Sequence, residues 1–354
     1  LEADTIAFTI MIDICARTYE AERAFNLFDE IKFLKLPMID YTYNAMLKVC
    51  ARRFDYFHKG FEILKEMKEA GYTPDSHSYH LLLSSCGPVG NLKAADLVMD
   101  KMEEDNIPIT IKSYGILLNV LARTIQKNPD HKVHTALIAR ADLVFNQLQK
   151  YALDKKASGQ VLNVEEDTIT PVILNCYISV YAEALRLRQV EALMPLFDEF
   201  GLKPIPSTYT MLLKMYSKTR RVEQCFDVYR QMKQHDIIPD KFGWRHLLNV
   251  CARTKYYANG FKILRLMIAS DFEITPDHIQ LFYRALASNK VPELNELKEL
   301  VWPYPKCRVF FLRPPPAYPC HPEPHSHVRP GEVKRKLKGK RWKKKSTTRK
   351  NKPK

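Results

Sequence analysis

The sequence predicts an all-α protein: an α-solenoid of about seven to eight helix-turn-helix repeats, followed by an extended basic C-terminal tail. Nearly the same eight residues recur as MIDICART at 11–18, MLKVCARR at 46–53, LLNVLART at 117–124 and LLNVCART at 247–254. Glycine is scarce, with 11 in 354 residues, as a helical protein requires. A fixed period between about 20 and 50 residues is typical of repeat architectures.

The repeating unit is about 35 residues long, because one equivalent position returns at that interval. The interval is longer only once, between the fourth and the fifth unit, which indicates inserted residues there. The equivalent residues are Cys15, Cys50, Cys86, Leu121, Tyr181, Tyr216 and Cys251.

Residues 40–75 contain one complete unit. Each half of the unit places apolar residues at helical spacing, and ARRFD at 51–55 interrupts the pattern between the halves. Gly71, Pro74 and Asp75 end the unit with residues typical of helix ends and turns. Neither helix buries its apolar face alone, whereas stacked hairpins do, so the pattern predicts a solenoid.

The same frame divides the chain into a solenoid at 1–301, a Pro-rich extended segment at 302–333 and a Lys/Arg-rich tail at 334–354. Within 302–333, RVFFLR fits a short strand or a plug on the last repeat. Small residues recur in the second helices where we expect close helix approach: Ala24, Gly60, Ala95, Ala141 and Gly260. The repeats fall near 5–39, 40–75, 76–110, 111–170 with insertions, 171–205, 206–240, 241–277 and, in part, 278–301.

Two insertions, at 124–140 and 151–167, lie in and after the fourth unit. Both add residues beyond the length of the repeat, and we expect them to be long loops that interrupt a regular groove. Long loops in compact folds are commonly functional or disordered. The insertions therefore predict contacts to a neighbouring molecule.

The repeat resembles the pentatricopeptide repeat, over roughly the first four-fifths of the chain. STYTMLLKMYSKTRRVEQCFDVYRQMKQHDIIPD at 207–240 carries the resemblance most clearly, with its Ser/Thr-Tyr start and Pro-Asp close. The tetratricopeptide repeat has a similar length, but its Trp/Gly/Tyr signature is not present. The resemblance implies first helices that line a groove for single-stranded RNA, read one base per repeat. It also implies an organellar protein, mitochondrial (matrix) or alternatively chloroplast.

In that family the fifth and last residues of each motif read the base. Carried over, Asn44 with Asp75 resembles a uridine reader and Thr210 with Asp240 a guanosine reader. The other pairs depart from the code, because isoleucine does not hydrogen-bond a base and Gly115 has no side chain. This departure favours recognition by shape and backbone. The other pairs are Thr9 with Ile39, His80 with Thr110, Gly115 with Thr170, Asn175 with Ile205, and Arg245 with Asp277.

Basic residues supply the candidate phosphate contacts. The tail carries 13 Lys and Arg without an acid, so the rest of the chain carries 42 basic against 40 acidic residues. Phosphates release counterions to such residues, and Trp342 is suited to stacking on a base. A targeting or solubility run is the alternative interpretation. The tail candidates are Lys334, Arg335, Lys336, Lys338, Lys340, Arg341, Trp342, Lys343, Lys344, Lys345, Arg349 and Lys350.

A second set of cations recurs at the ends of the first helices: Arg17, Arg52, Arg123, Lys218 and Arg253. Two interpretations stay open for them. They contact phosphates, or they stabilise a helix C-terminus through its dipole.

Catalytic and metal chemistry are not expected. The sequence has no phosphate-binding loop, no Gly-rich nucleotide fingerprint and no G-x-S-x-G, so we expect no enzyme, no cofactor and no small-molecule substrate. The cysteines of the first helices share their position with Leu and Tyr, which indicates packing residues in a reducing compartment. The spacing of one Cys/His cluster fits no usual zinc site; its members are Cys307, Cys320, His321, His325 and His327.

Two functions follow as hypotheses. The first is a structural subunit of the mitochondrial ribosome that contacts rRNA and neighbouring ribosomal proteins. The second is a free organellar factor for mRNA processing, stability or translation, and a helical-repeat scaffold for proteins is a third alternative. No apolar run is long enough to cross a bilayer, so no membrane partner is expected. The sequence begins at Leu1, and we expect the natural start to lie upstream.

Overall fold

The computed structural model describes residues 4–157, 168–289 and 292–312. The described residues are helices and short connections without strands, which confirms the all-α solenoid. Residues up to Arg308 belong to one compact unit, and Val309 begins a second. The basic tail lies outside the described residues.

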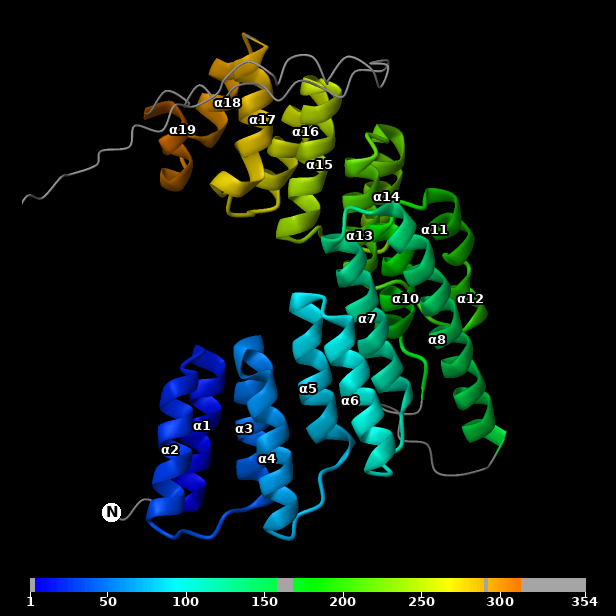
Figure 1. The fold of residues 1–354 in the computed structure, drawn as a ribbon. Helices are drawn as coiled ribbons and strands as arrows, with labels where there is room; N and C mark the ends of the chain where they lie inside the picture. The colour runs from blue at the N-terminus through cyan, green and yellow to red at the C-terminus, as the bar shows by residue number, and fades with distance from the viewer. Residues whose placement is uncertain (1–3, 158–167, 290–291, 313–354) are drawn as a thin grey trace, which may run out of the picture. The chain divides into compact units, whose positions relative to one another are not determined.

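The compact unit is a stack of helical hairpins (Figure 1). Each first helix packs against the first helix of the next hairpin and against its own second helix. The hairpins are α1 (Thr5–Thr18) with α2 (Ala21–Phe33), α3 (Asp40–Arg52) with α4 (Phe57–Glu69), α5 (Ser76–Val89) with α6 (Leu92–Glu104), α7 (Ile111–Lys127) with α8 (His131–Ala157), α10 (Pro171–Glu183) with α11 (Leu187–Leu193) and α12 (Leu196–Glu199), α13 (Pro206–Lys218) with α14 (Val222–Gln234), α15 (Lys241–Thr254) with α16 (Tyr257–Ala269), and α17 (Pro276–Ser288) with α18 (Leu294–Val301).

Local sequence sets where the first helices begin. Asp4, Asp75 and Asp240 accept backbone N–H groups of the first turn, which satisfies donors that a helix start leaves free. Pro171 and Pro206 occupy the first helical position, where no N–H is needed. Capping aspartates and first-turn prolines at the repeat boundaries therefore fix where these hairpins begin.

Close helix approach explains two of the small residues. A Cβ added to Gly60 would lie 2.3 Å from Leu82 Cδ2, and one added to Gly260 would lie 2.3 Å from Phe282 Cε2. Both contacts join a second helix to the first helix of the following hairpin. The expected close approach is confirmed at these two positions.

The apolar core is continuous through the stack, and the recurring cysteines belong to it. Cys50, Cys86 and Cys251 are fully buried, and Cys15 is 4% exposed. Burial raises the pKa of the Cys50 and Cys251 thiols to about 12. The packing interpretation of these cysteines is confirmed.

The first hairpin exposes a surface that later hairpins bury. Ile10 and Ile14 of α1 are 54% and 52% exposed, whereas the equivalent Ala45 and Val49 of α3 are 5% and 2% exposed. The difference arises because α1 packs against the α3 residues, while no helix of the described residues covers the α1 residues.

The loop prediction for the two insertions is wrong where the structure describes them. Residues 124–127 extend α7 to 17 residues, and 131–157 form the 27-residue helix α8. Buried residues such as Leu137 and Phe145 anchor α8 on the stack, so the inserted residues lengthen a hairpin. Residues 158–167 lie outside the described residues.

The predicted extended segment also differs at its start. Residues 302–304 form a turn, Pro305–Arg308 form a 3-10 helix, and Val309–Leu312 form the short helix α19. The strand interpretation of RVFFLR is therefore wrong for 309–312. Cys307 and Val301 are fully buried, and this burial explains why the chain stays compact beyond residue 301.

Candidate nucleic-acid interface

The predicted base-reading positions lie in the first turns of the first helices. The fifth residue of each motif lies one turn into its helix, and the last residue of the motif is the N-cap of the next first helix. These two positions face each other across neighbouring hairpins, because the first helices pack side by side. The structure therefore brings the members of a pair together wherever the register is kept.

Two of these side chains are engaged inside the stack. Thr9 is 1% exposed and its Oγ1 lies 2.7 Å from Thr42 Oγ1. His80 is 3% exposed and its Nε2 lies 2.7 Å from Ser113 Oγ. Burial, with nearby Lys112, lowers the pKa of His80 to about 4. Both side chains tie one first helix to the next, and their role as base readers stays a prediction.

The pair Asn44 and Asp75 is joined through Ser78. The Ser78 hydroxyl lies 2.7 Å from Asn44 Oδ1 and 2.8 Å from Asp75 Oδ1. Burial acts to raise the pKa of Asp75, but hydrogen bonds from the Ser78 N–H and hydroxyl lower it below its ordinary value. Asp75 therefore presents a carboxylate at neutral pH beside an amide, a combination able to meet the edge of a base.

The pair Thr210 and Asp240 is in direct contact. Thr210 Oγ1 donates to Asp240 Oδ1 over 2.9 Å. The same oxygen accepts the Gly243 N–H over 2.7 Å, so the carboxylate is fixed by its helix-capping role. The exposed pair resembles a preformed polar contact point.

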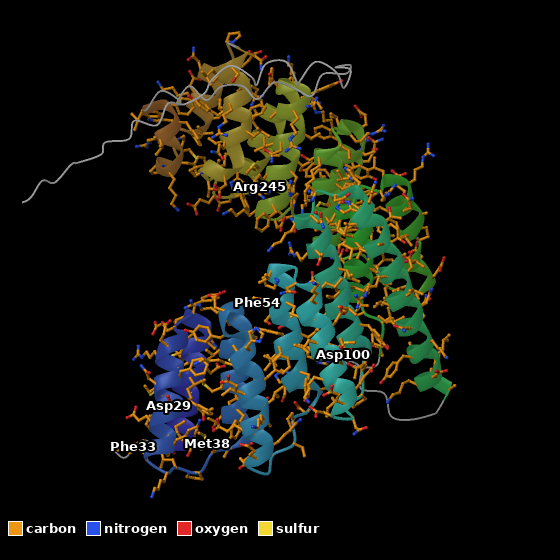
Figure 2. The ribbon with its side chains drawn as sticks, in the orientation of Figure 1. Asp29, Phe33, Met38, Phe54, Asp100 and Arg245 are labelled. Carbon is orange, nitrogen blue, oxygen red and sulfur yellow. The ribbon has the colours of Figure 1, made fainter. Side chains whose placement is uncertain are left out.

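The pairing of Arg245 with Asp277 is out of register. The N-cap of α17 is Thr275, and Asp277 is the second residue of that helix, where it lies 3.6 Å from Lys241. Arg245 stacks its guanidinium over the Phe242 ring at 5.1 Å (Figure 2 labels Arg245 on α15). Arg245 and Asp277 nevertheless line one hollow of about 260 Å³. The shift arises because the seventh repeat ends two residues earlier than expected.

The remaining pairs offer little to a base. Asn175 donates only a long hydrogen bond of 3.3 Å to Ser207, and its buried Oδ1 has no partner among the described residues. A Cβ at Gly115 would lie 3.0 Å from Ile173 Cγ1, so a larger residue there would require the Ile173 side chain to shift. Ile39, Ile205, Thr110 and Thr170 occupy N-cap positions.

A hollow of about 440 Å³ runs along α7, α10, α13 and α15. Burial, with the Arg245 charge next, lowers the pKa of His246 to about 4, so this side chain is neutral at pH 7. The hollow lies beside four consecutive first helices. Its lining includes Arg123, Asn175, Thr210, Lys214, Arg245 and His246.

Carboxylates hold several of the first-helix cations. Arg17 lies 2.7 Å and Lys48 2.5 Å from Asp13. The Lys48 hydrogen bond is the main cause that lowers the pKa of Asp13, and Arg17 adds to it against the effect of burial. Glu183 likewise pairs with Lys218 at 3.4 Å and with Lys214. These cations are partly neutralised before any phosphate arrives.

The other three cations of this set have other partners. Arg253 donates to the Ser217 carbonyl over 3.2 Å, at the C-terminal end of α13. Arg123 donates to Gln126 over 2.9 Å, and Arg52 lies over the Tyr19 ring at 5.9 Å. Arg253 thus fits the helix C-terminus interpretation, while Arg52 and Arg123 keep both interpretations open.

Of the five Cys and His residues of the predicted cluster, the structure describes only Cys307. Its thiol lies 3.4 Å from the Ile274 carbonyl, and burial raises its pKa to about 11. The other four members lie outside the described residues, as do all tail candidates. In the part of the chain that the structure describes, no cluster of three potential metal ligands is found.

Three residues not expected at the site hydrogen-bond the predicted base-reading side chains. Thr42, Ser78 and Ser113 share the third position of their motifs and hydrogen-bond the fifth residue of the preceding motif. The recurring Ser/Thr-Tyr start was the available signal. No helix among the described residues is long and apolar enough to span a membrane.

Comparison with known proteins identifies the family. A family model described as the pentacotripeptide-repeat region of PRORP matches residues 2–144 and 73–278. The small ribosomal subunit protein mL103 (rPPR7) of Arabidopsis thaliana is 20% identical over 291 residues, which cover 80% of this chain and 60% of that protein. The mitochondrial 15S rRNA processing factor CCM1 of Lachancea thermotolerans is 22% identical over 236 residues, covering 61% of this chain and 27% of that protein.

Among solved structures, the pentatricopeptide repeat protein PPR10 from maize matches with a TM-score of 0.36 and 17% identity, covering 85% of this chain and 54% of that chain. The chain spans between 35% and 60% of the length of the first three curated relatives. Because the family model covers most of the sequence, the chain belongs to the pentatricopeptide repeat family.

Proposed function

We propose that the chain is a non-catalytic RNA-binding protein that acts as a structural subunit of the mitochondrial ribosome and contacts rRNA through its solenoid and its basic tail. One observation carries this proposal: three of the seven fifth-position residues are unavailable to bases. Thr9 and His80 are buried in contacts between hairpins, and Gly115 has no side chain. A series of base readers that is interrupted at three repeats suits a fixed RNA that is held by its shape and backbone.

The relatives support an organellar RNA partner. One is named as a small ribosomal subunit protein and aligns with 80% of this chain. Another is named as a mitochondrial 15S rRNA processing factor. A further relative is described as chloroplastic, which supports a chloroplast location as the alternative. In a ribosome, neighbouring ribosomal proteins would be further partners.

Cosedimentation tests the ribosomal proposal. Organelle lysate is centrifuged through a sucrose gradient at low and at high salt, and the chain is followed by immunoblot. A structural subunit is expected to migrate with one ribosomal subunit at both salt concentrations. Migration in the soluble fraction at high salt would contradict the proposal, and an RNase-treated lysate serves as the control for RNA-dependent migration.

A second candidate, a free organellar factor that reads one transcript, is favoured by the two intact pairs. Asn44 with Asp75 and Thr210 with Asp240 have the polar geometry that base reading needs. The variants Asn44→Ala and Thr210→Ala separate the two functions. If shape dominates, each changes the affinity for oligonucleotides less than about threefold, whereas a single good base contact contributes about 1–3 kcal/mol of discrimination. A large loss confined to one base would favour the transcript reader.

A third candidate, a protein-binding scaffold, is favoured by the exposed isoleucines of α1. Ile6, Ile10 and Ile14 are each more than half exposed and follow one another at helical spacing. Exposed apolar stripes of this kind mark protein contacts. The variant Ile10→Asn alters this surface. If the variant still binds rRNA, the result argues against a scaffold that binds proteins alone.

A further inference from the structure

The turns between the first and second helices of three consecutive hairpins, with the first turn of α11, carry a set of cations that have no ion-pair partner among the described residues. We call this set the turn edge and define it as Arg186, Arg188, Arg220, Arg221 and Lys255. All five side chains are exposed. The first helices α10, α13 and α15 pack in sequence order, so the turns that follow them lie along one edge of the stack.

Equivalent positions of the repeat supply these cations. Arg220 and Lys255 occupy the left-handed residue that ends the first helix, with φ of 58° and 62°. Arg186 and Arg221 are the N-caps of the second helices. Tyr256 takes that position in the next hairpin and is 53% exposed. Each of the three turns therefore carries at least one basic residue, and the third turn adds the exposed Tyr256 ring.

Helix termination does not account for these cations. The carbonyl groups that the first helices leave free accept backbone N–H groups: Tyr181 from Arg186, Tyr216 from Arg221, and Cys251 from Tyr256. No turn-edge side chain donates to a helix carbonyl within the described residues. Arg253 differs, because its guanidinium caps α13 at the Ser217 carbonyl.

Carboxylates do not account for them either. Glu183 is engaged by Lys214 and Lys218, and Glu191 accepts the Tyr216 hydroxyl over 3.2 Å. Glu223 is exposed, Glu191 also lines a hollow with Arg188 and Arg221, and Glu293 lines a hollow with Lys255. None of the five lies within ion-pair distance of a carboxylate in the described part of the chain. Arg188 and Arg221 line one hollow of about 270 Å³, so their charges share a site.

We propose that the turn edge binds the phosphate backbone of a folded RNA helix, an inference that rests on the RNA-binding function proposed above. Asp13 and Glu183 partly neutralise four cations of the first helices, Arg17, Lys48, Lys214 and Lys218, whereas the turn-edge cations have no ion-pair partner in the described part of the chain. A row of phosphates attracts such a set by counterion release. The edge lies at the ends of the helices, where a rigid double helix has access, and double-stranded RNA is recognised mostly by shape, through phosphates and 2′-hydroxyls.

The test uses the full chain with Arg186→Gln, Arg188→Gln, Arg220→Gln, Arg221→Gln and Lys255→Gln combined. The probes are an RNA duplex of about 16 base pairs and a single-stranded oligouridine of about 12 nucleotides. Fluorescence anisotropy measures the binding of each RNA across a salt series. Duplex affinity at moderate salt is expected to fall about 10- to 100-fold, and the slope of log K against log salt to become shallower by about 3. The oligouridine affinity is expected to change less.

A matched control removes the same charge elsewhere. Five exposed lysines on second helices or on the turns between repeats are changed to Gln: Lys35, Lys65, Lys203, Lys233 and Lys262. The control is expected to keep the duplex affinity within about threefold, because long-range effects are screened within about 10 Å. An equal loss in both variants would overturn the proposal in favour of a net-charge effect.

A conservative variant guards against misfolding. Replacing the four arginines of the turn edge with Lys keeps the charge, so most of the duplex affinity is expected to remain. Equal binding of polyglutamate and duplex would overturn the proposal and indicate an acidic protein as the partner. If the wild type binds RNA and the Gln variant binds it equally well, the turn-edge proposal alone is overturned. If the wild type binds neither RNA, the proposed RNA-binding function is overturned.

Discussion

At the scale of single residues, polar side chains between hairpins carry both stability and specificity. Thr9–Thr42 and His80–Ser113 are buried hydrogen bonds of 2.7 Å that connect adjacent first helices. A buried polar group that lost its partner would cost about 1–3 kcal/mol. These positions therefore hold the register of the stack, and a polar residue there is explained without RNA.

His80 gives this register a pH dependence. Burial and nearby Lys112 lower its pKa to about 4, below the ordinary value of about 6.5. The folded state thus keeps His80 neutral while the unfolded state takes up a proton, so stability falls as pH decreases from 6.5 towards 4. At pH 5 the expected loss from this residue is about 2 kcal/mol of unfolding free energy.

The variant His80→Gln tests this dependence. Glutamine keeps a hydrogen-bonding group near Ser113 but does not titrate, so the variant should lose about 2 kcal/mol less than wild type between pH 7 and pH 5. Urea unfolding at both pH values measures the difference, and His58→Gln, which makes the same change on the exposed surface, controls for the substitution itself. Parallel pH profiles for wild type and His80→Gln would contradict the assignment.

At the scale of helices, the hairpins stack closely because small residues let a second helix meet the next first helix. Gly260 faces the Phe282 ring, and Gly60 faces the tip of Leu82. Glycine normally costs a helix about 1 kcal/mol relative to alanine. Its presence here indicates that contact between hairpins outweighs helix propensity.

The variant Gly260→Ala should therefore destabilise the protein. The added Cβ would lie 2.3 Å and 2.5 Å from two Phe282 ring atoms, and overpacking of this kind costs about 1–3 kcal/mol. Urea unfolding measures the loss. Combining Gly260→Ala with Phe282→Leu should restore part of the lost unfolding free energy. A double-mutant cycle without coupling would show that the two residues are not in contact.

At the scale of the whole molecule, the sequence predicts the structure that the repeats share. Prediction is wrong where one repeat contains residues that the other repeats lack. The period and the apolar spacing predict the hairpins, because seven copies average out local exceptions. The helix α8 is not predictable from the repeat frame, because the inserted residues have no counterpart in the other repeats. Buried side chains such as Leu137 and Ala141 show that the segment packs on the stack. The N-cap at Thr275 lies 35 residues after the N-cap at Asp240, so this repeat keeps the regular length, and the expected end at Asp277 was two residues too late.

The candidate site shows the same limit. Sequence places Asn44, Asp75, Thr210 and Asp240 at reading positions, and the structure brings the members of each pair together. Sequence does not show that Thr9 and His80 meet polar partners from the next hairpin, because a hydrogen bond between repeats depends on two positions at once. Burial and partner geometry decide which polar residues remain available.

The basic tail adds the last prediction. Deleting 334–354 removes 13 basic residues, and each lost phosphate contact should make the salt slope of RNA binding shallower by about 0.7 to 0.9. Affinity should fall similarly for every RNA sequence, because phosphate contacts carry no base information. Anisotropy titrations of wild type, the tail deletion, the turn-edge variant and their combination measure these slopes.

If the tail and the turn edge contact different phosphates of one RNA, their effects on the slope should add, as independent sites do. A combined variant with no further change beyond the tail deletion would show that the tail alone supplies the electrostatic binding. An unchanged slope after deletion would instead indicate that the tail does not contact RNA, and the solenoid would then have to hold rRNA by the cations of its helices and turns.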